Sequence, residues 1–414
     1  MAEVPPPPVP TQLIVFADDW GRHPSSSQHL IRELLPQYSV LWVNTVGTRK
    51  PRISDLTRLW ERLPKRKSAL ERAFDRIVEH HAAEHKDQFT VISPLMYPGF
   101  RTQWQRRFNT GRLAKAIHAH TRPDHRRVVI TTLPITANLV GCIDADRWLY
   151  YCVDDYSTWP GTDQAIMAEM EATLVERVDA LVSASGVLRD RLRGFACRDE
   201  PKTLTHGVNL ELWDGRLRTQ WNEALNPNDP LDEPFWWYES PDWTEAWSGQ
   251  SVVLFWGLID ARLDVNWLAR LKECDAVDRI ALVGPSNAPP EQLRSWADLP
   301  GKVDHKRLPV IATASSVLIM PYIDAAVTRA MQPLKLKEYL ATMKPVVVRD
   351  LPSTRQWADC CDLASTPEAF VRLVKERIRT GTPRDQLEAR KRRLADESWS
   401  SKAAQLAAII NEGA

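Results

Sequence analysis

The stretch that decides the fold is MQPLKLKEYLATMKPVVV, Met331–Val348, which follows the apolar run VLIMPY at 317–322. An apolar strand, a short polar loop, a helix opened by Pro333 and a second valine-rich strand are typical of one βαβ unit in a parallel sheet. A proline suits the first turn of a helix, because the N–H that it lacks would have no partner there. We therefore expect a parallel α/β domain around this unit.

The helix of this unit carries a lysine and a glutamate on one face. Lys335 and Glu338 are three positions apart and are neighbours on the helix surface. A positive helix N-terminus with a lysine one turn in and a carboxylate beside it can hold an anion and hydroxyls together. A sugar nucleotide presents both groups, because its diphosphate is flanked by riboses. The alternative is an ordinary amphipathic helix with Lys335 and Glu338 in solvent.

Short apolar strands alternate with longer helical stretches on both sides of this unit, which predicts βα units and parallel sheets. Two series of them are separated by the tryptophan-rich, acidic stretch Trp213–Gln250. The expected strands are Leu13–Ala17, Val40–Asn44, Phe89–Ser93, Val128–Thr132, Trp148–Val153 and Ala180–Ala184 in the first series, and Val252–Trp256, Ile280–Val283, Val317–Pro321 and Pro345–Val348 in the second.

The residues from Thr328 to Val348, TRAMQPLKLKEYLATMKPVVV, resemble the donor-binding segment of family 4-like glycosyltransferases. The resemblance implies a GT-B fold: two Rossmann-like domains facing across a cleft, with a C-terminal helix that packs back on the first domain. It also implies that Glu338 binds donor hydroxyls and that sugar transfer retains the anomeric configuration. The family often has a second glutamate eight residues earlier, where this chain has Ala330.

A chain of 414 residues is long for a single core, so two domains are expected. We predict an N-terminal acceptor-side domain over residues 1–210 and a nucleotide-sugar-binding domain over 251–395. Residues 211–250 form a linker or insertion that caps the cleft or, alternatively, presents its tryptophans to a partner. Residues 396–414 form the crossing helix.

The second domain offers further donor-binding candidates. The segment VVLFWGLIDARLD at 252–264 resembles the phosphate-facing loop of the family, with Gly257 at the end of its strand. Arg262 could grip phosphate oxygens, because a guanidinium donates in pairs, or it could pair with Asp260 or Asp264. Gly284 ends the next strand and permits close backbone approach, and Arg329 is a second phosphate candidate.

The first domain offers acceptor-side and catalytic candidates. The loop ADDWGRHPSSSQHL at 17–30 contains HPSSSQH, which resembles a bacterial subset of the family. Asp154 and Asp155 end the strand LYYCV, where carboxylates suit hydroxyl binding or proton transfer; alternatively, Asp155 caps the next helix and Asp154 pairs with an arginine. We predict that His23 is a catalytic residue, as a donor or a base, and that Ser25, Ser26, Ser27 and Gln28 contact the acceptor or a donor phosphate, although the serines could simply cap a helix.

Several function classes lose support. A formal charge of +1 does not favour nucleic acid as a partner, and no G-x-G-x-x-G or Walker A pattern is present. We expect neither a cofactor nor a metal: Asp144-Ala-Asp146 precedes its strand instead of following it, and His81-Ala-Ala-Glu-His85 fits a solvated helix end. Six cysteines without a C-x-x-C pair and no run of eighteen apolar residues predict a reduced, cytoplasmic protein.

The sequence predicts a metal-independent hexosyltransferase of polysaccharide biosynthesis that uses a nucleotide-sugar donor and a glycan or lipid-linked acceptor. The basic stretch Arg49–Arg76 contains partly helix-spaced leucines, so we also consider an anionic membrane surface as a partner. Its alternative is a solvated helix. A sugar-nucleotide epimerase on the same fold and a non-catalytic sugar-nucleotide-binding protein remain open.

Overall fold

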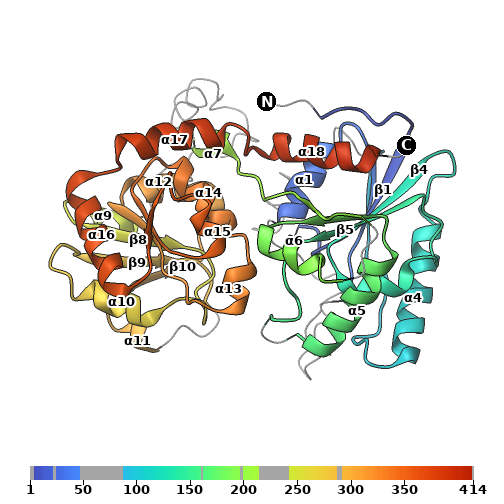
Figure 1. The fold of residues 1–414 in the computed structure, drawn as a ribbon, viewed down its shortest axis with the longest axis horizontal. Helices are drawn as coiled ribbons and strands as arrows, with labels where there is room; N and C mark the ends of the chain where they lie inside the picture. Colours follow the sequence, from blue (N-terminus) through green and yellow to red (C-terminus); the bar gives the residue numbers. More distant parts are fainter. Residues whose placement is uncertain are drawn as a thin grey trace. The chain divides into compact units, whose positions relative to one another are not determined.

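The computed structural model describes residues 4–21, 25–46, 87–159, 162–195, 199–213, 242–286 and 291–412. The chain forms two compact units, each with its own parallel sheet (Figure 1). Unit 1 consists of the described residues within Met1–His206, Ala330–Gln332 and Trp399–Ala414. Unit 2 consists of those within Gly207–Arg329 and Pro333–Ser398.

The sheet of unit 1 has the strand order β3-β2-β1-β4-β5-β6-β7, and all of its pairs are parallel. All six residues of β1 are buried, as a strand covered on both faces requires. The strands are β1 (Thr11–Phe16), β2 (Ser39–Val43), β3 (Phe89–Ile92), β4 (Arg126–Thr131), β5 (Arg147–Cys152), β6 (Ala180–Ser183) and β7 (Lys202–Thr203).

The helices of unit 1 include the C-terminal helix of the chain, which packs on α1 (Figure 1). The ring of His29 stacks on Trp399 with centroids 4.7 Å apart, and the hydroxyl of Tyr38 donates to Asn411 at 3.2 Å. The predicted return of the last helix to the first domain is therefore confirmed. The helices are α1 (Ser26–Leu34), α4 (Gln103–His118), the 3-10 helix η1 (Pro134–Leu139), α5 (Gln164–Arg177), α6 (Gly186–Leu192) and α18 (Trp399–Asn411).

The sheet of unit 2 is also parallel and has the strand order β10-β9-β8-β11-β12-β13. Its central strand β8 is buried along its full length. The strands are β8 (Val252–Trp256), β9 (Arg279–Val283), β10 (Asp298–Gly301), β11 (Val317–Met320), β12 (Val346–Arg349) and β13 (Asp362–Ala364).

The βαβ unit around Met331–Val348 forms as predicted, from β11 through helix α14 to β12. Pro333 is the N-cap of α14 instead of its first residue, with φ −74° and ψ 104°. The helices between Gly207 and Ser398 are α7 (Leu210–Trp213), α9 (Asp242–Glu245), α10 (Val265–Lys272), α11 (Glu291–Arg294), η2 (His305–Arg307), α12 (Leu308–Thr313), α13 (Ala326–Ala330), α14 (Leu334–Ala341), α15 (Pro352–Arg355), α16 (Pro367–Thr380) and α17 (Arg384–Leu394).

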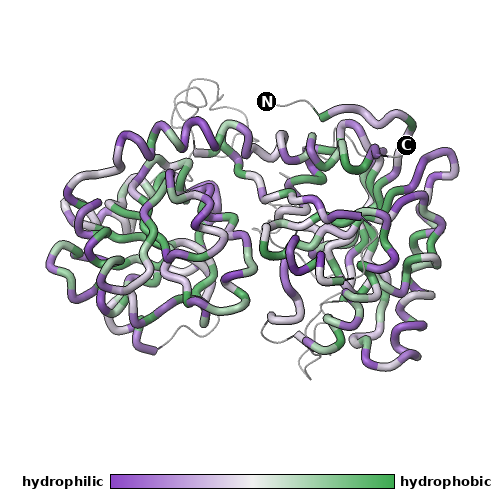
Figure 2. Tube along the Cα trace, viewed as in Figure 1, coloured by the Kyte–Doolittle hydropathy of each residue, from purple (hydrophilic) through white to green (hydrophobic). Residues whose placement is uncertain are grey.

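Each unit has a core along its sheet. Figure 2 shows hydrophobic residues concentrated on the strands and hydrophilic ones on the outer turns of the helices. In the ranges given above, no helix is long and apolar enough to cross a membrane.

The tryptophans at the two ends of the stretch Trp213–Gln250 belong to the core of unit 2. Trp213 stacks on Trp256 at 5.5 Å, and the indole N–H of Trp247 donates to Asp298 at 3.3 Å. Both side chains are buried, so the alternative of a tryptophan surface for a partner is wrong for these two residues. Residues 214–241 lie outside the described part of the chain.

Candidate functional site

Two glycines shape the carboxyl edge of the unit 2 sheet. Gly257 follows β8 with φ 140°, and Gly284 follows β9 with φ 143°, a conformation that side chains rarely adopt. A Cβ on Gly284 would lie 2.0 Å from the carbonyl oxygen of Gly257. Both positions therefore require glycine, and the two loops approach each other closely at the edge where ligands bind in such sheets.

Lys335 extends from the first turn of α14 over Gly257. A Cβ on Gly257 would lie 2.0 Å from the Lys335 Nζ, so the ammonium occupies the space of the missing side chain. Nζ donates to the Tyr322 hydroxyl at 2.7 Å and lies 4.9 Å from the centroid of the Phe255 ring. Among the described residues, Lys335 forms no ion pair with a carboxylate. The ammonium is thus held in place by neutral groups and retains donors for a ligand.

Glu338 lies one turn further along α14 and is buried, with 8% of its surface exposed. Its Oε2 accepts the indole N–H of Trp256 at 3.0 Å, and its Oε1 lies 2.7 Å from His305 Nε2. Burial by itself raises the pKa of Glu338, but the charge and hydrogen bond of His305 and the bond from Trp256 lower it below its usual value. Glu338 is therefore an ionised group with a fixed orientation.

His305 is the partner of Glu338 that sequence reasoning missed. It begins η2, and its ring packs edge-on against Trp213 with centroids 6.0 Å apart. Burial lowers the pKa of His305, but the carboxylate of Glu338 outweighs it and raises that pKa above its ordinary value. The sequence signal was weak, because a lone histidine 33 positions from Glu338 has no motif around it.

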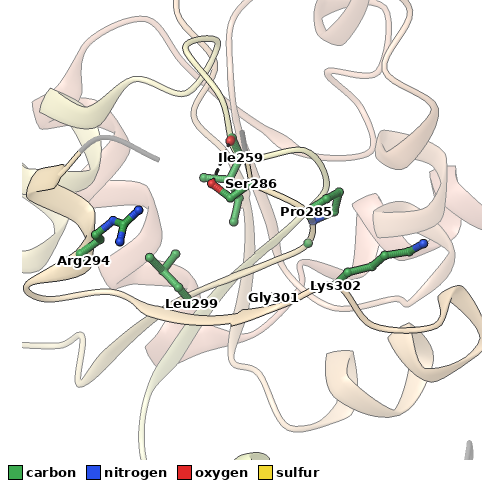
Figure 3. A pocket seen from close by; sticks show the side chains of 8 residues that line it. Ile259, Pro285, Ser286, Arg294, Leu299, Gly301 and Lys302 are labelled. Atoms are coloured by element: carbon green, nitrogen blue, oxygen red, sulfur yellow. Dashed lines mark hydrogen bonds between the residues drawn. The ribbon is translucent and has the colours of Figure 1, made fainter. Parts of the chain in front are cut away.

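A cavity of about 390 Å³ opens beside Gly284, within the range of small-molecule sites (Figure 3). Arg294 and Lys302 lie on opposite sides of it in Figure 3, and neither forms an ion pair within the described part of the chain. Gly284, which lines the cavity, also lies close to Gly257, because a Cβ on Gly284 would meet the Gly257 backbone. The remaining lining residues are Ile259, Pro285, Ser286, Leu299 and Gly301.

The two arginines predicted to bind phosphate are paired with neighbouring aspartates. The Arg262 guanidinium contacts Asp260 through Nε at 3.0 Å and Nη2 at 2.9 Å, which is one of the alternatives that the sequence left open. Arg329 donates to Asp324 at 2.8 Å and is 59% exposed. Phosphate binding by either arginine stays a prediction, and it would require these local pairs to rearrange.

The serine loop of unit 1 caps α1. Ser25 is the N-cap, and its hydroxyl accepts the backbone N–H of Gln28 at 3.4 Å. Gln28 is fully buried; its side chain accepts from Gly21 N and donates to Asp19 O, both at 3.3 Å. Gln28 therefore holds the loop together, while Ser26 lies half-buried and Ser27 buried on the first turn. His23 lies outside the described residues.

Asp154 and Asp155 follow β5 at the carboxyl edge of the unit 1 sheet. Asp155 is buried, accepts the backbone N–H of Ser157 at 3.0 Å and lies 3.3 Å from Arg191. Arg191 also donates to the fully buried Glu171 at 3.0 Å. Asp155 thus belongs to a buried charge network, while the half-buried Asp154 is the more accessible of the two carboxylates.

Of the two metal-binding patterns considered in the sequence, the structure describes only Asp144-Ala-Asp146. The backbone N–H of Arg127 donates to the Asp146 carboxylate at 2.7 Å, and the Arg127 guanidinium forms an ion pair with Asp144, also at 2.7 Å. His81 and His85 lie outside the described part, as does the basic stretch Arg49–Arg76. The described cysteines, Cys142, Cys152, Cys274, Cys360 and Cys361, are all free thiols.

No protein-family model matches the chain. In an alignment of 206 residues that covers 46% of this chain, the chain is 26% identical to the teichuronic acid biosynthesis glycosyltransferase TuaH of Bacillus subtilis. The match covers 45% of that protein, so this chain spans less than half the length of the curated relative.

Solved structures resemble the whole chain. Sucrose-phosphate synthase of Thermosynechococcus elongatus has a TM-score of 0.63 at 14% identity and covers 96% of this chain and 98% of its own. HepE of Anabaena, solved with UDP and glucose, has a TM-score of 0.56 at 12% identity, with 97% of each chain covered. A UDP-forming trehalose-phosphate synthase of Burkholderia xenovorans scores 0.60 at 11% identity and covers 97% of this chain and 99% of its own.

These likenesses define the class of fold. Two parallel-sheet α/β domains, as in GT-B glycosyltransferases, account for the chain from its first described strand to its last helix. The fold class predicted from the sequence is therefore confirmed.

Proposed function

We propose that the protein is a glycosyltransferase that moves a sugar from a nucleotide-diphosphate-sugar to an acceptor. The observation that carries the proposal is the Lys335 ammonium, fixed over Gly257 at the carboxyl edge of the unit 2 sheet, with ionised Glu338 one turn away. The fold and the name of the curated relative support the same activity.

In this proposal Lys335 meets the diphosphate. Departure of the diphosphate concentrates negative charge on its oxygens, and a preorganised ammonium at that point stabilises the charge without reorganising first. The Nζ group retains N–H donors beyond the one that it gives to Tyr322. Fixed cations would then supply the leaving-group stabilisation, which is why we propose a metal-independent reaction with no cofactor beyond the sugar nucleotide.

The remaining parts of the donor would extend away from the ammonium on both sides. Glu338 is placed to accept from ribose hydroxyls, because carboxylates accept hydrogen bonds and this one is held ionised. The cavity beside Gly284 has room for a nucleobase. Since the HepE and trehalose-phosphate synthase structures involve UDP, we propose UDP-hexoses as the first donors to test.

We further propose the family 4-like subgroup, retention of configuration, and a glycan or lipid-linked acceptor in polysaccharide biosynthesis. The relative named for teichuronic acid biosynthesis supports the acceptor class. A lipid-linked acceptor would place the protein in the cytoplasm at an anionic membrane surface. The acceptor side would lie in unit 1, where Asp154 is an accessible carboxylate at the edge of the sheet.

The test is UDP and UDP-hexose binding by calorimetry to the full chain and to Lys335→Met. Losing a charge-assisted hydrogen bond costs about 1.5–3 kcal/mol, so we expect roughly 10- to 150-fold weaker binding. Lys272→Met, which removes an exposed ammonium at the last residue of α10, is the control and should bind like the parent. Equal affinity in Lys335→Met and the parent would refute the site.

A second assay separates transfer from the alternatives. The protein is incubated with labelled UDP-glucose and no acceptor. Slow release of free glucose supports a transferase, since water replaces the missing acceptor. A new sugar nucleotide would instead show epimerisation, and binding with neither product would favour a non-catalytic module.

A further inference from the structure

A row of apolar side chains stands exposed on unit 1 where α4 begins. Leu95 and Tyr97 precede the helix, and Trp104 and Phe108 lie on its first turns. Trp104 is 61% exposed and Leu95 54%, which is unusual for side chains of this size. We call these four residues the aromatic ridge.

The ridge is an ordered structure in which the rings contact one another. Tyr97 and Trp104 meet edge to face at 5.4 Å, and Trp104 stacks on Phe108 at 5.7 Å. Buried Asn109 holds the backbone of Tyr97 from both sides, accepting its N–H at 2.7 Å and donating to its carbonyl at 3.1 Å. The protein therefore holds these rings on its surface with internal hydrogen bonds.

Positive charge lies beside the ridge. Helix α4 carries three arginines and a lysine without one acidic residue. Arg107 and Lys115 are exposed, and neither forms an ion pair within the described part of the chain. Arg106 differs, because Glu169 binds it with two hydrogen bonds of 2.6 and 3.0 Å. The helix therefore presents uncompensated cations next to apolar rings.

The ridge also lies at the functional edge of unit 1. Helix α4 follows β3 in a parallel sheet, so its N-terminus lies at the carboxyl edge. Arg101 pairs with Asp163 at 2.6 Å, which ties the start of α4 to the start of α5. Because α5 follows the Asp154–Asp155 loop, the ridge and the predicted acceptor side share one edge of the sheet.

We propose that the aromatic ridge, with Arg107 and Lys115, docks this protein on an anionic lipid bilayer. Tryptophan and other rings favour the membrane interface, and lysine and arginine beside them bind anionic headgroups. The exposed Arg107 and Lys115 on the same helix favour an anionic bilayer over a neutral saccharide surface. The inference rests on the membrane association proposed above and assigns it a surface.

The test is co-sedimentation of the full chain with phosphatidylcholine vesicles, with and without about 30% phosphatidylglycerol. We expect binding to the anionic vesicles only. Charge reversal in R107E/K115E should weaken binding at least about 30-fold, since each basic residue contributes about a factor of five. Loss of the rings in W104A/F108A should weaken vesicle binding about tenfold. Both rings are exposed, so this variant should fold as the parent does, and a thermal melt checks that it does.

The matched control is R372E/R379E, which reverses two exposed arginines on α16 of unit 2 and should bind as the parent does. If both ridge variants bind the anionic vesicles as tightly as the parent does, the ridge is not the docking surface, and another surface must account for membrane association. Ridge-dependent binding to polygalacturonate in place of vesicles would overturn it in favour of an acidic glycan. UDP affinity, measured in parallel, reports separately on the donor site, so failure of the proposed transferase is distinguishable.

Discussion

Replacing Gly257 by alanine is the sharpest perturbation of the donor site that the structure offers. The added Cβ would lie 2.0 Å from the Lys335 Nζ and 2.8 Å from its Cε, so the ammonium has to leave its position. It then loses the 2.7 Å bond to Tyr322 and its contact with the Phe255 ring. No other large movement is required, because the clashing atoms are the end of a flexible side chain.

The expected magnitude has two components. A non-glycine residue at φ 140° costs about 1–3 kcal/mol of backbone strain. The displaced ammonium regains water, so the lost hydrogen bond and ring contact add only about 1 kcal/mol. We expect the free energy of unfolding of unit 2 to fall by roughly 2–4 kcal/mol. UDP affinity should also fall, roughly 10- to 150-fold, because the ammonium no longer meets the diphosphate.

The assay is urea unfolding together with UDP binding by calorimetry, for Gly257→Ala and for a matched variant. Gly381→Ala is the match, because Gly381 also has positive φ (72°) but nothing lies within 4 Å of its added Cβ. It should lose stability through strain and keep its UDP affinity. If Gly257→Ala binds UDP within twofold of the parent, Lys335 does not hold the diphosphate.

Two further predictions concern the buried charges. The pKa of His305 is raised, so the stability that His305 contributes is complete below its ordinary pKa of 6.5 and is lost as the pH rises through the raised pKa. The pKa of Glu338 is lowered, so the stability that Glu338 contributes is complete above its ordinary pKa of 4.5 and is lost as the pH falls through the lowered pKa. Thermal melts should show the parent's advantage over His305→Gln largest between these values; a difference that is constant from pH 5 to 9 would contradict the pair. In unit 1, Glu171→Gln should lower the free energy of unfolding by about 3–5 kcal/mol, because Arg191 loses its fully buried carboxylate and keeps only Asp155 at 3.3 Å. A free energy of unfolding within about 1 kcal/mol of the parent, measured in urea, would disprove the network.

Most of the strands that the sequence predicted are runs of apolar residues buried on both faces, although the predicted edge strand β3 is only partly buried. Val317–Pro321 and Pro345–Val348 are of this kind, and they form β11 and β12 with one register between them. The strands that were missed, β7, β10 and β13, are two to four residues long and lack such an apolar run. β10 has the sequence DLPG, with a proline and a glycine, and it forms a strand because it pairs with the neighbouring strand β9. Edge strands depend on their neighbours more than on their own composition.

Arg262 shows the same limit within the donor site. The sequence offered two roles, a phosphate ligand and a partner of a nearby aspartate, and its spacing was compatible with both. The structure has Arg262 on Asp260, two residues away. Which role a guanidinium takes depends on the oxygens that the fold brings within reach, and local sequence does not contain that information.

The sequence by itself determined the class of fold, the βαβ unit that carries Lys335 and Glu338, and the glycines at the strand ends. Each of these follows from local rules: burial of apolar runs, helix spacing, and backbone angles that only glycine adopts freely. The tertiary structure alone decided how those residues are used. It brought Trp256 from 82 positions away and His305 from 33 to the two oxygens of Glu338, and it placed the Lys335 ammonium over Gly257. Such contacts join strands and helices that are distant in sequence, so they exist only once the sheet has assembled.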